Sequence, residues 1–365
     1  MKINEIKLRF FRNYDNLTVD TTSKLNIFIG NNAQGKTNLL ESIYYLSTTQ
    51  SFRDVKEIEL VKENEAFSQI EVLFENDSNR SNTLKSIIHQ EGKSFYLNNN
   101  ILTKTSDVIG IINTILFSPT DLNLILSVPK VRRRFMDIEI GKINKKYILE
   151  LRNYHKVLKD RNLYLKENSI DFNYLGILTG QLVDYSIYIY EERKKFIDYI
   201  NSNINLVLNK ISTINERVSI KYLSINCNKE ELLVKYDQQL EKDILFKKTN
   251  IGIHKDEFEV YIDNKLVSSY ASQGQIRLIV LAIKLTLIDY VKDNANYLPI
   301  LLLDDVLSEL DVTNQSKLFS YIDKDIQTFI TTTDINDLVK MQNKDYTIYT
   351  IDSGNIVNMR GFTNE

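Results

Sequence analysis

The chain has 365 residues, a formal net charge of −2 and a hydrophobic content of 43%. This length predicts either two domains or one large domain with an insertion, with enough apolar residues for sizeable cores. The single cysteine, Cys227, excludes an intrachain disulfide framework and a zinc site of four cysteines. No apolar run reaches the roughly 20 residues of a transmembrane helix, and no signal peptide is visible, so we expect a cytoplasmic protein with no membrane partner.

Branched and aromatic residues in short runs, separated by polar turn residues, predict strands in the first third of the chain. Three consecutive asparagines, Asn98 to Asn100, predict the tip of a turn. The expected strands cover residues 2–11, 24–29, 70–74, 84–89 and 94–97.

After about residue 130 the apolar spacing changes to three and four, which predicts helices. Strand signals return at residues 257–262, with Asp263 and Asn264 as a turn, and are followed by a helix at 274–290 and a strand at 300–303. The pattern predicts an α/β fold interrupted by a helical insertion. The expected buried stripes of that insertion are Tyr147, Leu151, Tyr154, Leu158 and Leu165 on one helix, and Leu182, Ile189, Phe196, Ile200, Ile204, Val207 and Ile211 on another.

Residues 30–37 match the pattern G-x-x-x-x-G-K-S/T, between the strand-like stretch LNIFI and the helical stretch NLLESIYYL. The glycines let the loop curl so that backbone N–H groups and a helix N-terminus face the phosphates of a nucleotide. Lys36 is expected to neutralise the β- and γ-phosphate oxygens, and Thr37 to offer its hydroxyl to Mg²⁺. The predicted ATP-binding residues are Gly30, Asn31, Asn32, Ala33, Gln34, Gly35, Lys36, Thr37 and Asn38.

The apolar run at residues 300–303 ends in two carboxylates, Asp304 and Asp305. A buried parallel strand delivers acids to the carboxyl edge of a sheet in this way. Asp304 is therefore the expected Mg²⁺ ligand beside Thr37. Asp305, pointing the other way along the strand, is expected to orient or deprotonate the attacking water, so that Lys36, Asp304 and Asp305 form the predicted catalytic set.

A third motif, S-Q-G-Q at residues 272–275, lies where a strand passes into a helix upstream of the acid pair. A serine, a glycine and exposed amide N–H groups at a helix start form an anion site without a lysine. In isolation this motif is more typical of a helix cap than of a ligand site. Its position before the acid pair favours nucleotide contacts from Ser272, Gly274 and Gln275.

These motifs, with residues 308–311 (SELD), are arranged as in ABC-type ATPase heads, where the signature motif of one protomer covers the γ-phosphate held by the other. More narrowly, the chain resembles the RecF family of bacterial recombination-repair ATPases. The resemblance runs nearly end to end and implies further nucleotide contacts from Arg12 and Asp311. The segments that carry it are FFRNY, GKTNLLESIY, SFR at 51–53, the block LFSPTDLNLILSVPKVRRRFMD, GIHKDE at 252–257, SYASQGQIR and ILLLDDVLSELD.

The resemblance implies an ABC-type P-loop ATPase head with a compact helical insertion lobe and no long coiled coil. The head would comprise residues 1–118, with the phosphate loop, and residues 246–365, with the signature and acid motifs; residues 119–245 would form the lobe. The implied activity is weak ATP hydrolysis with Mg²⁺, coupled to an ATP-dependent homodimer. That dimer would clamp double-stranded DNA and single-strand/double-strand junctions near gaps or stalled forks, and would help to load RecA with RecR and RecO as partners.

The sequence departs from related ATPases at several positions. Ile253 stands where the family usually has proline, and Ala33 replaces a glycine common in related heads. ABC transporters normally carry glutamate where Asp305 stands, and the shorter carboxylate predicts slow hydrolysis. The switch histidine is absent from residues 329–334 (FITTTD), so a threonine there is the candidate for contact with the γ-phosphate.

Three sets of cationic and titratable residues have more than one interpretation. Residues 125–169 hold twelve Lys or Arg against five Asp or Glu, a local excess of +7. Within it, Lys130, Arg132, Arg133 and Arg134 fit contacts with DNA phosphates or a solvated helix start equally well. His254 is more typical of a structural histidine than of a catalytic one. Arg12 and Arg53 fit nucleotide or DNA-linked contacts as well as packing roles.

Two other functional classes stay open at this point. One is a non-enzymatic DNA-binding or scaffold protein of the SMC-like class, with ATP as a structural ligand. The other is an ABC transporter ATPase subunit, which would need a membrane partner and is disfavoured by Asp305. A small-molecule P-loop kinase would not need the S-x-G-Q motif.

Overall fold

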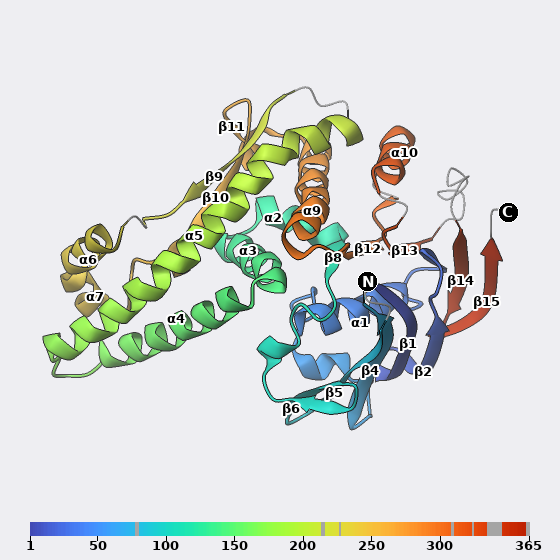
Figure 1. Ribbon diagram of the computed structural model, residues 1–365, viewed down its shortest axis with the longest axis horizontal. Coiled ribbons are helices and arrows are strands. Elements are labelled where there is room, and N and C mark those ends of the chain that lie inside the picture. Colours follow the sequence, from blue (N-terminus) through green and yellow to red (C-terminus); the bar gives the residue numbers. More distant parts are fainter. Residues whose placement is uncertain are drawn as a thin grey trace. The chain divides into compact units, whose positions relative to one another are not determined.

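The computed structural model describes residues 1–76, 80–212, 216–225, 228–307, 310–322, 325–333 and 345–362 (Figure 1). Cys227, Ser308, Glu309 and Asp334 lie outside the described residues. The chain divides into two compact units. Unit 1 comprises Met1–Asp121, Val207–Thr213 and Leu281–Glu365, and unit 2 comprises Leu122–Leu206 and Ile214–Val280. The domain boundaries expected at residues 118 and 245 stay predictions. The chain changes unit after Asp121 and again after Val280.

Unit 1 contains a six-stranded sheet in the order β15-β14-β3-β13-β12-β8, parallel except for the edge strand β15. Its central strands β12 and β13 are buried along their whole length, as expected of strands that are covered on both faces. Because β3, β12 and β13 run parallel, their carboxyl ends meet at one edge, with Thr331 opposite Asp304 and Thr332 opposite Ile29. The strands are β3 (Leu25–Ile29), β8 (Thr114–Phe117), β12 (Ile300–Asp304), β13 (Thr328–Thr332), β14 (Tyr346–Asp352) and β15 (Asn355–Phe362).

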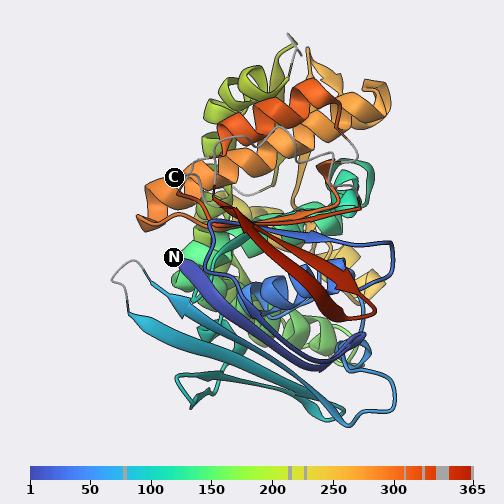
Figure 2. The ribbon, with the colours of Figure 1, turned by 90° about the vertical axis from the view of Figure 1, so that its right-hand side faces the viewer.

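A second, antiparallel sheet of unit 1 has the order β2-β1-β4-β5-β6-β7. Helix α1 (Lys36–Thr48) lies between the two sheets, and its Leu39, Leu40, Ile43 and Leu46 belong to a core shared with both (Figure 2). The expected strands of this region are confirmed, while β2 and β7 were not expected. The strands are β1 (Lys2–Phe11), β2 (Tyr14–Asp20), β4 (Phe67–Glu75), β5 (Ser81–His89), β6 (Gly92–Leu97) and β7 (Asn100–Leu102).

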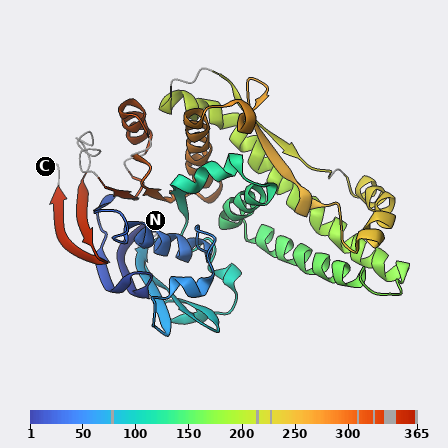
Figure 3. The same cartoon turned by 180° about the vertical axis from the view of Figure 1, so that it is seen from behind.

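Unit 2 is mainly helical, with α4 and α5 running side by side (Figure 3). The stripe of apolar residues expected along α5, from Leu182 to Ile211, is buried. Strand β10 (Glu257–Ile262) pairs with β9 (Val218–Leu223) and β11 (Lys265–Leu266) in a three-stranded sheet, and β9 was not expected. The helices are α2 (Asn123–Leu126), α3 (Pro129–Ile143), α4 (Lys145–Tyr164), α5 (Phe172–Ile211), α6 (Lys229–Gln238), α7 (Leu240–Phe246) and α8 (Val267–Tyr270).

Helix α9 (Gln273–Ala295) begins in unit 2 and ends in unit 1, as α5 also belongs to both. Lys284 of α9 is buried within unit 1, where its Nζ atom donates to the carbonyl oxygen of Leu116 at 2.6 Å and pairs with Asp121. Asp121 is the last residue of unit 1 before the chain enters unit 2, so this ion pair fixes that exit point to α9. Within the described ranges, no helix is long and apolar enough to cross a membrane.

Candidate nucleotide-binding site

The phosphate loop connects β3 to α1, and its conformation requires glycine at Gly35. The φ angle of Gly35 is 113°, in the left-handed region that other residues rarely adopt. A Cβ atom there would lie 2.6 Å from Asn13 Nδ2, and the Tyr14 hydroxyl donates to the Gly35 carbonyl oxygen at 2.9 Å. The turn between β1 and β2 therefore packs directly against the start of α1.

The middle of the loop is held by backbone and amide contacts from two turns of unit 1. Asn13 Nδ2 donates to the Gln34 carbonyl oxygen at 3.0 Å, and the Gly354 N–H donates to the same oxygen at 3.1 Å. Ser353, in the turn between β14 and β15, donates its backbone N–H to Gln34 Oε1. These contacts build the loop before any ligand binds, while Asn31, Asn32 and Ala33 at its crest are exposed.

The Lys36 ammonium group is enclosed by the loop itself. Its Nζ atom donates to the carbonyl oxygens of Gly30 at 2.6 Å and Asn31 at 2.7 Å. Burial lowers the pKa of Lys36, and the nearby charges of Asp305 and Asp304 oppose that shift. The cation is thus held inside the curl of the loop, where phosphate oxygens could replace the two carbonyl oxygens as its partners.

Thr37 and Asp304, 267 residues apart in the chain, meet at the carboxyl edge of the parallel sheet. Asp304 Oδ1 accepts from Thr37 Oγ1 at 2.8 Å and from Thr331 Oγ1 at 2.8 Å. Burial raises the pKa of Asp304, while the two hydroxyl donors and the charge of Arg53 act in the opposite direction. A hydroxyl and a carboxylate side by side fit Mg²⁺, which usually takes only one or two protein ligands at nucleotide sites.

Asp305 lies outside β12, which ends at Asp304. The expectation that Asp305 continues the strand is wrong, because its φ angle is 50°, in the left-handed region. Its backbone N–H donates to Thr331 Oγ1 at 3.0 Å. Thr331, which stands near the position of the missing switch histidine, therefore contacts both acids rather than facing solvent.

A buried carboxylate beside the loop was not predicted from the sequence. Glu41 of α1 is fully buried and accepts two hydrogen bonds from Arg12, at 2.9 and 2.8 Å. Ser51 also donates to Glu41, and Arg53 Nη1 donates to Asn38 Oδ1 at 2.9 Å. Arg12 thus has a structural partner, and its predicted contact with nucleotide stays a prediction. The sequence offered one signal, since Glu41 directly follows two leucines within the helical stretch NLLESIYYL.

The signature motif belongs to unit 2 and forms the N-terminus of α9. Ser272 and Gln275 make a capping box: Gln275 N donates to Ser272 Oγ at 3.2 Å, and Ser272 N donates to Gln275 Oε1 at 2.9 Å. Ser272 and Gly274 are exposed. The cap that the sequence favours in isolation is therefore present, and it leaves the helix N-terminus open to solvent.

Asp311 is also a helix cap. It precedes α10 (Val312–Tyr321), and its Oδ1 atom accepts from the backbone N–H groups of Thr313 and Asn314, both at 2.9 Å. Contact between Asp311 and a nucleotide stays a prediction.

Comparison with known proteins agrees with this geometry. A family profile described as "RecF/RecN/SMC N terminal domain" matches residues 2–356. A DNA replication and repair protein RecF from Oenococcus oeni is 38% identical over 374 residues, which cover 98% of this chain and 100% of that protein. The protein of the same name from Streptococcus agalactiae is 40% identical over 363 residues, 98% of each chain. The chain belongs to the RecF family.

The solved structures support the RecF fold. A structure of the recombination mediator protein RecF with ATP, in the RecFOR pathway, superposes with a TM-score of 0.90 at 30% identity and covers 99% of this chain and 97% of that one. An Smc head from Pyrococcus furiosus has a TM-score of 0.57 at 16% identity, which shows the shared head fold alone. Membership of the RecF family argues against the alternative that the chain is an ABC transporter ATPase subunit.

The RecF-like block from Leu116 to Asp137 holds the basic residues proposed for DNA contact, and two of them already bind other residues of unit 2. Arg132 is buried; its Nη1 atom donates to the Ser127 carbonyl oxygen at 2.8 Å, and its Nη2 atom pairs with Glu257. Arg133 donates to the Asp256 carbonyl oxygen at 2.8 Å. Arg132 is therefore not an exposed DNA contact as the basic run suggested, whereas Lys130 is exposed.

His254, in the RecF-like segment GIHKDE, occupies a structural position within unit 2. Its Nε2–H donates to the Thr249 carbonyl oxygen at 3.1 Å, so Nδ1 accepts from the Tyr154 hydroxyl at 2.6 Å. Burial lowers the pKa of His254 to about 4. The ring is thus neutral at pH 7, as a structural histidine requires.

This pKa predicts a pH dependence for unit 2. Because the folded pKa of about 4 lies below the ordinary value of 6.5, the stability from neutral His254 is complete above pH 6.5 and is lost as the pH falls toward 4. Over that window the slope reaches at most about 1.4 kcal/mol per pH unit. For His254→Gln, we expect the free energy of unfolding, measured with urea, to change less steeply with pH between about 4 and 6.5. An identical pH profile in the variant would contradict the assignment.

Proposed function

We propose that the chain binds Mg²⁺ and ATP at residues 30–38. The single observation that supports this most directly is the Thr37–Asp304 hydrogen bond, which joins a preformed phosphate loop to a buried acid. Lys36 would exchange its two carbonyl partners for β- and γ-phosphate oxygens, and backbone N–H groups at the start of α1 would hold the remaining phosphate charge. A bound Mg²⁺ would neutralise the developing phosphate charge, held by Thr37 and Asp304.

Asp305 is proposed to orient the attacking water. Its backbone is fixed through Thr331, the residue that also donates to Asp304, so the two acids share one support. The side chain of Asp305 is one methylene shorter than the glutamate of transporters, so its carboxylate lies farther from the attacking water. We therefore expect slow turnover. Slow turnover suits a switch whose ATP-bound state has to persist.

The signature motif is proposed to act on a second copy of the chain. The exposed N-terminus of α9, with Ser272 and Gly274, provides N–H donors and the positive end of a long helix. Two copies related by a twofold axis would each place this motif over the ATP of the other. ATP would then act as the ligand that closes the dimer, and hydrolysis would open it.

The proposed role of the closed dimer is to clamp double-stranded DNA at single-strand gaps, junctions or stalled forks. Support for this role comes from the relatives, which are described as DNA replication and repair proteins and as a recombination mediator of the RecFOR pathway. We accordingly propose that RecR and RecO are partners and that the dimer helps to load RecA. DNA affinity and ATP turnover measured together test it: ATP-dependent duplex binding without turnover would instead favour a scaffold with ATP as a structural ligand.

A substitution at Ser272 tests the shared site without removing the helix cap. Aspartate and asparagine both cap helices well, but aspartate would repel the γ-phosphate. We expect Ser272→Asp to bind ATP as a monomer and to lose ATP-dependent dimerisation. Ser272→Asn also keeps the helix cap, and it should lose less of the ATP-dependent dimerisation. Sedimentation velocity with and without ATP measures this. Dimerisation of Ser272→Asp at wild-type ATP and protein concentrations would disprove the shared site.

A further inference from the structure

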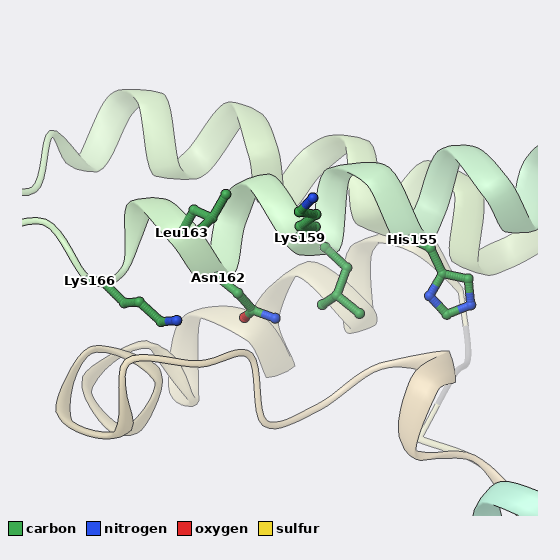
Figure 4. Close-up of a pocket in the computed structure, with 6 residues that line it drawn as sticks. His155, Lys159, Asn162, Leu163 and Lys166 are labelled. Atoms are coloured by element: carbon green, nitrogen blue, oxygen red, sulfur yellow. The ribbon is translucent and has the colours of Figure 1, made fainter. Parts of the chain in front are cut away.

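One face of α4 carries a groove that the proposed ATPase does not use. Five of the lining residues recur along α4 at helical spacings of three and four, so they lie along a single face of the helix, and the sixth, Lys166, lies in the turn that follows it. Together they border a hollow of about 290 Å³ within unit 2 (Figure 4). The lining residues are His155, Leu158, Lys159, Asn162, Leu163 and Lys166.

The charge of this groove has one sign. Lys159 and Lys166 are exposed, and none of the six lining residues is acidic. Lys159 lies within α4, and Lys166 lies in the turn that follows it. Two ammonium groups on one groove attract a ligand that carries several negative charges.

The groove is also apolar. Leu163 lies between the two lysines in the sequence and remains 52% exposed. Exposed apolar side chains are frequent on the elements joined to this end of α4: Phe172 and Ile177 on α5, and Leu245 and Phe246 on α7, are each 58 to 74% exposed.

This end of unit 2 is held rigidly, so its exposed residues are not a consequence of loose packing. The buried guanidinium group of Arg161 joins three elements: it donates to Thr179 on α5 at 3.0 Å, to Asp243 on α7 at 2.8 Å and to Thr249 at 2.7 Å. Asn162, a groove residue, accepts from Thr249 N at 2.6 Å. The groove floor is thus preformed, which lowers the entropic cost of binding.

We propose that the α4 groove docks an acidic amphipathic segment of a partner protein. Carboxylates of that segment pair with Lys159 and Lys166, and an apolar side chain packs on Leu158 and Leu163. A nucleic acid fits less well, because its phosphates offer nothing apolar to the two leucines of the groove.

Fluorescence anisotropy with the full-length protein, without nucleotide, tests this proposal. The probe is a fluorescein-labelled acidic peptide with interspersed leucine and phenylalanine; its companion has serine in place of each leucine and phenylalanine. The variants are Lys159→Glu with Lys166→Glu, and Leu163→Ser, with the exposed Lys194→Glu of α5 as the matched control. All four positions are exposed, so the variants are expected to keep the wild-type melting temperature.

We expect saturable binding of the probe that weakens about tenfold with the double charge reversal and about fivefold with Leu163→Ser. Lys194→Glu should bind like wild type, and the serine companion should bind more weakly. The proposal is overturned if the probe shows no saturable binding, or if both peptides bind alike. It is equally overturned if duplex DNA binds in the groove, with a dependence on Lys159 and Lys166 and none on Leu163.

Discussion

Replacement of Asp304 with asparagine is expected to slow ATP turnover by about 100-fold or more while the protein keeps its fold. The amide oxygen of asparagine can still accept from Thr37 and Thr331, which both donate to the same carboxylate oxygen. The lost negative charge weakens the proposed Mg²⁺ site, and a metal that stabilises transition-state charge contributes several kcal/mol. Steady-state phosphate release in the presence of Mg²⁺ measures the effect.

The stability of this variant should not fall. Burial raises the pKa of Asp304, which means that the folded state disfavours its charged form. A neutral asparagine removes that penalty, so its unfolding temperature is expected to equal or exceed that of wild type. The exposed Asp325 of the same unit provides the control, since Asp325→Asn should change neither turnover nor stability. Turnover of Asp304→Asn within about threefold of wild type would remove Asp304 from the metal site.

Replacement of Arg161 with methionine is expected to destabilise unit 2 by about 3 to 5 kcal/mol. Arg161 and Asp243 are both fully buried, and the substitution leaves the Asp243 carboxylate without its cation. Asp243 also accepts from the backbone N–H of Asn250 at 2.9 Å, so the segment after α7 should loosen with it. Urea unfolding measures the loss, and hydrogen exchange assigns it to unit 2.

An exposed ion pair in the same unit supplies the control. Lys229 and Asp184 are each more than half exposed, and solvent screens such pairs, so Lys229→Met should leave stability unchanged. The phosphate loop lies in unit 1, so Arg161→Met should still bind ATP at temperatures where unit 2 is folded. An unfolding free energy within about 1 kcal/mol of wild type would mean that Asp243 is compensated by other groups.

The candidate site was the most predictable part of this protein. The loop spacing, its flanking strand and helix, and the apolar run before Asp304 each depend on local sequence, and parallel strands necessarily bring their carboxyl ends to one edge. The buried stripe of α5 and the strands β1 and β10 were equally legible, because periodicity alone specifies them.

Other features depend on contacts between distant residues and could not be predicted. Arg132 looked like part of an exposed basic run, yet it is buried because Ser127 and Glu257 accept from it. Strand β9 was not predicted, because it is stabilised by pairing with β10, which is distant from it in the sequence. The division into units is hidden because α5 and α9 continue through it, so that no change in composition marks the boundary.

The central claim is that each ATP is enclosed by the phosphate loop of one protomer and the signature motif of another. Mixing two inactive variants tests it most directly. Lys36→Ala has a disabled loop and an intact signature, while Ser272→Asp has an intact loop and a disabled signature. A mixed dimer restores one complete site, so turnover should rise to about a quarter of the wild-type value in an equimolar mixture. Turnover no greater than the average of the two variants measured alone would contradict the shared site.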